Sequence, residues 1–155
     1  MTGQDEAIHA PLTRLGLMAR REALGLNQSQ LGRLLGVSQV TISTWEHGRR
    51  RGRGAIPPAI GGQLLELEAI SDQLTALAVE AVMAADDGAE DLTLRSFLTD
   101  EDLWDAHPEL EPVPAAVHRV AMAAAARRLD REHGIAASIT DWSEATGAPV
   151  RAASD

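Results

Sequence analysis

Apolar side chains recur every three or four residues through most of the first 85 positions, which predicts consecutive α-helices. The pattern indicates four of them, over residues 11–23, 28–35, 39–47 and 57–85. The fourth would be ~35 Å long or more at 1.5 Å per residue. Its apolar stripe is wide, so this helix requires a partner, either the second half of the chain or a second subunit.

The pattern changes after residue 85, where an acidic run leads into a segment that alternates apolar and polar residues. That period of two is typical of a strand. An Ala-rich helix that ends at Gly134 then precedes a second candidate strand. We expect the tail from Ser143 to be mobile. The predicted order is acidic loop 86–91, strand 92–98, short helix and turn 99–114, helix 115–133 and strand 135–142.

The turn between the second and third helices is the most informative feature of the chain. Asn27 and Ser38 are good N-caps, and only residues 36–38 separate the two helices. A turn this short cannot place them side by side, so they must cross steeply, as in a helix-turn-helix. Gly32, inside the second helix, indicates that another helix crosses closely there.

The outward face of the third helix is polar and carries no charge before Glu46. Glutamine can pair with adenine, Ser and Thr can donate or accept a hydrogen bond, and Val can contact a thymine methyl group. The predicted base-contacting residues are Gln39, Val40, Ser43 and Thr44.

The charge distribution supports nucleic-acid binding by the first part of the chain. The net charge is −9, which alone argues against it. Residues 1–60, however, hold eight Arg and four acids, a local +4, whereas residues 61–155 hold six Arg and nineteen acids, a local −13. Such asymmetry points to a nucleic-acid-binding half. The basic cluster after the third helix is predicted to contact phosphates through Arg49, Arg50, Arg51 and Arg53.

The stretch Asn27–Gly48, with Arg21 and the residues Leu24-Gly25-Leu26-Asn27-Gln28, resembles the Cro/CI-type helix-turn-helix family, also called the xenobiotic-response-element (XRE) family. The resemblance covers residues 11–65 and implies a lambda-repressor-like bundle. It implies that Gln28 contacts a phosphate. It also implies a partly buried ion pair between Arg21 and Glu46. The loop 49–58 departs from the family by being more basic and longer.

The second half is weakly similar to the C-terminal dimerisation region of anti-CRISPR-associated and YdiL-like repressors. We therefore predict a mainly α protein: a helix-turn-helix bundle, a long connecting helix and a small α+β dimerisation unit. The predicted divisions are residues 1–60 for DNA binding, 61–85 for the linking helix, and 86–155 for dimerisation or partner binding.

Several classes of function find no support in the sequence. The chain has no Cys, no apolar run of the ~20 residues that span a membrane, and no basic-then-apolar start typical of a signal peptide. The five His lack metal-ligand spacing, so we expect surface or capping roles for them and no metal or other cofactor. Motifs of nucleotide-binding loops and hydrolase nucleophiles are missing as well. The sequence therefore favours a non-enzymatic protein.

These observations predict a sequence-specific transcriptional regulator, a homodimeric bacterial repressor that binds an inverted-repeat operator in the major groove of double-stranded DNA. Its expected location is the cytoplasm, at the nucleoid. An alternative is an antitoxin-type protein whose residues 86–155 bind a partner protein. A regulator that senses a small ligand is a third possibility, which a cavity between the long helix and the strands would favour.

Overall fold

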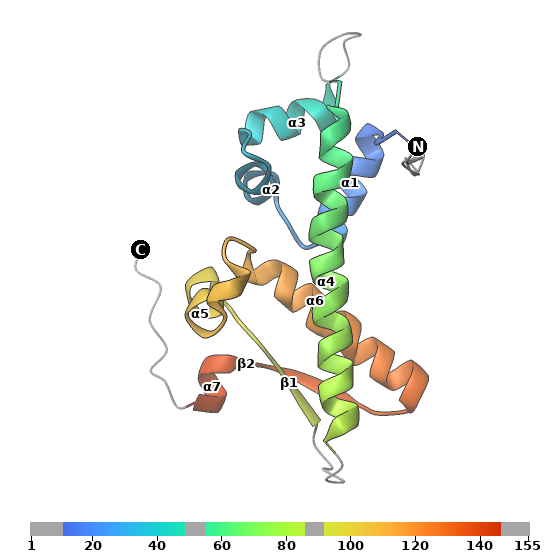
Figure 1. Cartoon of the computed structure of the whole chain (residues 1–155), viewed down its shortest axis with the longest axis vertical. Coiled ribbons are helices and arrows are strands. Elements are labelled where there is room, and N and C mark those ends of the chain that lie inside the picture. The colour runs from blue at the N-terminus through green and yellow to red at the C-terminus, as the bar shows by residue number, and fades with distance from the viewer. Residues whose placement is uncertain (1–10, 49–54, 86–91, 147–155) are drawn as a thin grey trace, which may run out of the picture.

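The computed structural model describes residues 11–48, 55–85 and 92–146. The arginine cluster 49–53 and the acidic loop 86–91 therefore lie outside the described residues. The described part of the chain is mainly helical and contains a small two-stranded sheet (Figure 1). The elements are α1 Arg14–Ala23, α2 Gln28–Leu35, α3 Gln39–His47, α4 Pro58–Ala84, β1 Leu92–Ser96, α5 Asp100–Ala106, the 3₁₀ turn η1 Pro108–Leu110, α6 Ala115–Arg128, the π-turn η2 Leu129–His133, β2 Ala137–Asp141 and α7 Trp142–Thr146.

Side-chain caps set the N-terminal ends of the first three helices. Asn27 and Gln30 form a reciprocal capping box at the start of α2, with both hydrogen bonds at 2.8–2.9 Å. Gly36 ends α2 with φ +70°, and Ser38 caps α3. The predicted start of α1 at residue 11 was wrong, because Thr13 is extended and its hydroxyl accepts a hydrogen bond from the backbone of Gly16. A capping residue of this kind stands outside the helix that it caps.

Gly32 is required by the turn that follows α2. A Cβ atom at this position would lie 2.7 Å from the carbonyl oxygen of Val37 and 3.3 Å from the backbone nitrogen of Gln39. The sequence predicted that another helix crosses closely at Gly32. What lies against Gly32 is the backbone of the turn and of the first residue of α3. The absence of a side chain lets the two helices meet across a turn of three residues.

We expect Gly32→Ala to lower the free energy of unfolding by about 1–2 kcal/mol, because overpacking against backbone outweighs the gain of ~1 kcal/mol in helix propensity. Gly61→Ala is the matched control, since a Cβ atom at Gly61 in α4 meets nothing within 4 Å. That change should stabilise the protein by about 0.5–1 kcal/mol. Urea denaturation measures both. A stabilised Gly32→Ala protein would contradict the proposed clash.

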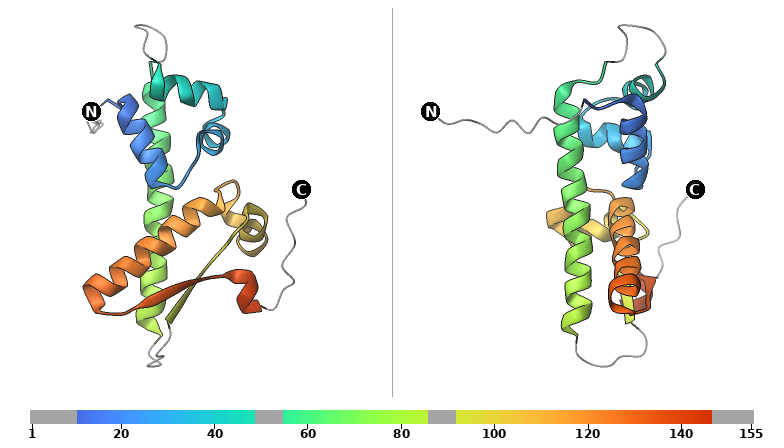
Figure 2. Two further views of the ribbon diagram at one scale, coloured as in Figure 1. Left: turned by 180° about the vertical axis from the view of Figure 1, so that it is seen from behind. Right: turned by 90° about the vertical axis from the view of Figure 1, so that its right-hand side faces the viewer.

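The helix α4 runs along the whole molecule and contributes to two cores. Figure 2 shows α1–α3 and α6 on the same side of it. Its first half supplies Ile60, Leu64 and Leu67 to a core with α1–α3, and that core also contains Val113 and Val117 from the second half. A second core joins the other end of α4 to α6, β1 and η2. The predicted division into residues 1–60, 61–85 and 86–155 stays a prediction.

The two predicted strands pair with each other in parallel. Leu92 lies opposite Ala137 and Ser96 opposite Asp141, and the connection between the strands carries α5, η1, α6 and η2. A parallel pair needs a long crossover of this kind. The prediction of a mobile tail from Ser143 was wrong for its first residues, which belong to α7 (Trp142–Thr146).

Candidate nucleic-acid interface

The helix α3 has a buried face and an outward face of different chemistry. Ile42 and Trp45 are buried in the first core. Gln39, Val40 and Thr44 are exposed, with Val40 exposed over 68% of its surface, and Ser43 is half-buried. The predicted base-contacting residues line one shallow depression of the surface, together with His47 and Gly48: they are Gln39, Val40, Ser43 and Thr44.

The hydroxyl of Thr44 has a defined hydrogen-bonding role. It donates to the carbonyl oxygen of Val40 one turn earlier, at 2.8 Å. The proton is therefore used within the helix, and the oxygen lone pairs remain as acceptors. In this rotamer Thr44 suits an amino group of adenine or cytosine. Val40 beside it offers the apolar contact that a thymine methyl group takes.

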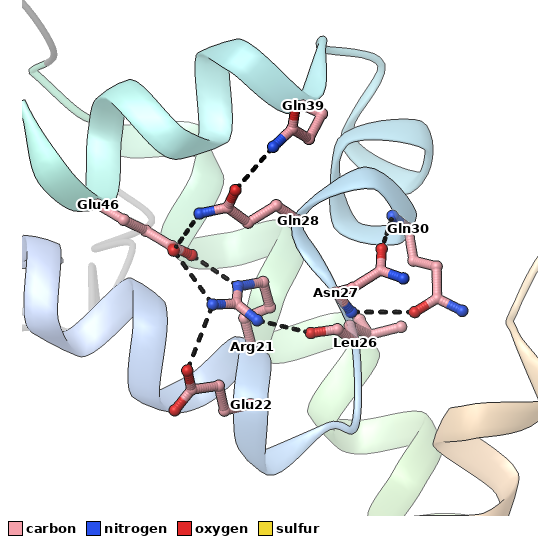
Figure 3. A network of polar contacts seen from close by, with 8 residues as sticks. All are labelled: Arg21, Glu22, Leu26, Asn27, Gln28, Gln30, Gln39 and Glu46. Carbon is pink, nitrogen blue, oxygen red and sulfur yellow. Dashed lines mark hydrogen bonds and ion pairs between the residues drawn. The ribbon is translucent and has the colours of Figure 1, made fainter.

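The interior beneath α3 holds a buried ion pair between Arg21 of α1 and Glu46 of α3 (Figure 3). Arg21 Nε and Nη2 donate to the two carboxylate oxygens of Glu46 at 2.7 and 3.1 Å. Arg21 Nη1 donates to the carbonyl oxygen of Leu26 at 2.8 Å, which also ties the pair to the turn before α2. The predicted partners thus lie together and connect three segments of the domain.

The pKa of Glu46 reflects two opposing causes. Burial alone would raise it, but hydrogen bonds from Arg21 and Gln28 stabilise the carboxylate, and the pKa lies below its usual value. The pKa of Arg21 is raised by its hydrogen bonds to Glu46. Both groups are therefore charged at neutral pH, and each neutralises the other away from water.

A chain of hydrogen bonds leads from this pair to the surface. Gln28 Nε2 donates to Glu46 Oε2 at 2.8 Å, and Gln28 Oε1 accepts from Gln39 Nε2 at 2.9 Å. The charged acceptor at Glu46 fixes which end of the Gln28 amide faces inward, and this orients its oxygen towards Gln39. Gln39, the first residue of α3, is thus held by a network that begins in the core (Figure 3).

The sequence did not indicate this connecting role of Gln28. The resemblance assigned Gln28 a phosphate contact, which stays a prediction; here its amide lies between Glu46 and Gln39. Positions 28, 39 and 46 come together only because the turn at residues 36–38 folds α3 back across α2. The arginines predicted to contact phosphates lie outside the described residues: Arg49, Arg50, Arg51 and Arg53.

The described part of the chain offers neither a metal site nor a membrane span. No group of three or more His, Cys, Asp or Glu in the described ranges could hold a metal ion. None of the helices that the structure describes is long and apolar enough to cross a membrane.

Comparison with known proteins gives an independent result for this region. Residues 17–51 match a protein family described as Helix-turn-helix. The match covers α1 from Leu17 onwards, α2 and α3, which contain the ion pair and the outward face of α3. It supports a DNA-binding helix-turn-helix domain of the Cro/CI type. No curated protein matched the chain.

Proposed function

We propose that this protein is a sequence-specific transcriptional regulator that places α3 in the major groove of double-stranded DNA. The helix-turn-helix match supports a DNA-binding regulator. The observation that carries the proposal is the outward face of α3, which is uncharged and whose first residue, Gln39, is held by the network that runs from Arg21 and Glu46. In this proposal Gln39, Val40, Ser43 and Thr44 contact base edges.

Phosphate contacts supply affinity in this proposal. Gln28 lies at the start of α2, beside Asn27, Ser29 and Gln39 on one patch of surface. The arginine cluster 49–53 follows α3 directly in the chain. Because phosphate contacts position a protein on DNA without reading sequence, these residues act as anchors while α3 discriminates.

The protein acts as a homodimeric repressor in this proposal. A single face of four side chains gives limited affinity, and two copies related by a two-fold axis would read an inverted repeat one helical turn apart. The acidic second half keeps non-specific binding low because it repels phosphate. The site of action would be the bacterial nucleoid.

Selection of bound sequences from random DNA tests the proposal. The expected winner is an inverted repeat with half-sites ~34 Å apart from centre to centre. A single unrepeated motif would contradict the dimer while preserving DNA recognition. Failure to enrich any motif would contradict sequence-specific binding.

Gln39→Ala is expected to reduce discrimination between the selected motif and a motif altered at one adenine by about 1–3 kcal/mol. Gel-shift titrations against both sequences at one salt concentration measure it. Gln63→Ala is the matched control, since Gln63 is exposed on α4 and does not line the depression on α3. Equal weakening of both sequences would assign Gln39 to phosphate contact instead.

A further inference from the structure

A large cavity lies between the second half of α4, the strand β1, the segment 107–113 and α6. Its volume is about 960 Å³, at the upper end of the 300–1,000 Å³ typical of small-molecule sites. Most of its wall is apolar, including Ile70, Leu74, Leu77, Leu92, Leu94 and Met122. Leu77, in this wall, is exposed over 52% of its surface.

One polar group in this wall is built into the fold. His118 of α6 is only 7% exposed, and its Nδ1 atom is hydrogen-bonded to Ser96 Oγ of β1 at 2.9 Å. Phe97 packs edge-on against the ring, with centroids 5.1 Å apart. The imidazole is thus held in one orientation, and because Ser96 uses Nδ1, Nε2 is the ring nitrogen left for a molecule in the cavity.

The charge state of His118 restricts what that molecule can be. Burial, together with the charges of His107 and Arg119, lowers the pKa of His118 to about 4. The ring is therefore neutral at pH 7 and offers a hydrogen bond without a charge. A neutral hydroxyl or amine matches this neutral ring better than a carboxylate or an ammonium group, because a charge placed beside it would lose water without gaining a charged partner. The charged residues that line the cavity, Arg95, Glu109 and Glu111, are exposed and keep their contact with water.

The dimensions favour a small molecule over a second protein chain. A helix is at least 10 Å across, and a cylinder of that width filling this volume would be only ~12 Å long, about two turns. An interface between chains needs roughly 800 Å² on each partner. The cavity is bordered on several sides, by α4, β1 and the segment 107–113.

We propose that this cavity binds a small, uncharged, mostly apolar molecule with one hydroxyl or amine group that hydrogen-bonds to Nε2 of His118. Two contacts of the cavity wall suggest how a bound molecule would affect the DNA-binding domain. This consequence rests on the function proposed above. Val113 lines the cavity and also belongs to the first core. The same α6 that carries His118 packs on the turn between α1 and α2, where Val120 faces Gly25.

Binding of the fluorescent probe N-phenyl-1-naphthylamine, an uncharged apolar amine, tests the proposal on the full-length protein. Ala81 and Ala84 are both exposed on α4, but only Ala81 lines the cavity. We expect the unchanged protein to bind the probe saturably. Ala81→Phe should weaken the affinity for the probe about tenfold or more, because the ring fills the space. Ala84→Phe should change that affinity by no more than about twofold. No saturable binding, or equal binding to the two variants, would overturn the ligand site.

His118→Asn tests the hydrogen bond. Asparagine can keep the bond to Ser96 but has no counterpart of Nε2. The amine probe should lose affinity in this variant, whereas 1-phenylnaphthalene, which lacks the amine, should bind the variant and the unchanged protein alike. Equal losses for the two probes would overturn the role of His118.

Oligomeric state and affinity for DNA are the two remaining measurements. Light scattering should show the same oligomeric state for Ala81→Phe as for the unchanged protein; dissociation of an oligomer would make the cavity an interface between copies and overturn the proposal. Probe at saturation should shift affinity for selected DNA at least threefold. An unchanged affinity overturns the coupling alone, while failure to select any DNA contradicts the function proposed above.

Discussion

Replacing Glu46 with alanine is expected to lower the free energy of unfolding by about 3–5 kcal/mol. Its carboxylate is fully buried and accepts hydrogen bonds from both Arg21 and Gln28. The substitution leaves the charge of Arg21 inside the domain with only the carbonyl oxygen of Leu26 and the more exposed Glu22 nearby. A buried charge without its counter-ion costs far more than the pair itself contributes. Urea denaturation followed by circular dichroism measures the loss.

Glu68→Ala is the matched control. Arg20 and Glu68 also form a two-pronged pair, with both bonds at 2.7 Å, but their side chains are 31% and 29% exposed. Water solvates the charge that remains when an exposed pair of this kind is broken, so we expect the free energy of unfolding to fall by about 1 kcal/mol or less. Geometry is similar in the two pairs and burial differs. Equal losses in the two variants would contradict the view that burial makes the Arg21–Glu46 pair indispensable.

Acidification is expected to destabilise the protein through His118 by roughly 3 kcal/mol between pH 6.5 and pH 4. The pKa of His118 falls from 6.5 to about 4 on folding, chiefly because the ring is buried, and each unit corresponds to about 1.4 kcal/mol. The unfolded chain therefore binds more protons in this range. The stabilisation is complete above pH 6.5 and is lost as the pH falls towards 4.

Comparison with His118→Asn isolates this contribution, because carboxylates also titrate at low pH. The variant should be less stable than the unchanged protein at pH 7, and the difference between the two should shrink as the pH falls to 4. Denaturation at half-unit pH intervals measures this difference. A difference that stays constant with pH would show that His118 does not take up a proton on unfolding.

The helix-turn-helix was readable from the sequence because its determinants are local. Asn27, Gly36 and Ser38 act on their own neighbouring backbone, and the structure places α2 and α3 at the predicted bounds. The first helix was predicted too long because Pro11 and Leu12 fit the helical pattern, while Thr13 is extended and caps the helix instead. Apolar spacing alone does not distinguish a first turn from the residues before it.

The buried histidine could not be read from the sequence. All five His were expected at the surface or at helix caps, and for His118 this was wrong, since it is buried between β1 and Phe97. The surrounding helix is rich in Ala, and α6 buries residues on more than one face, including Ala115, Ala121 and Ala125. A helix of small residues shows little amphipathic pattern, so no periodicity marks which side chains face inwards.

The turn at Gly25 makes the DNA-binding segment dependent on residues far along the chain. Its φ is +73°, and a Cβ atom there would lie 2.8 Å from Val120 and 3.2 Å from the carbonyl oxygen of Ala116. Val117 of the same helix fills the first core. The 35 residues of the family match therefore cannot be exchanged with another protein's as an independent cassette. A chimaera would have to bring α6, or a substitute for its surface, together with the transplanted helices.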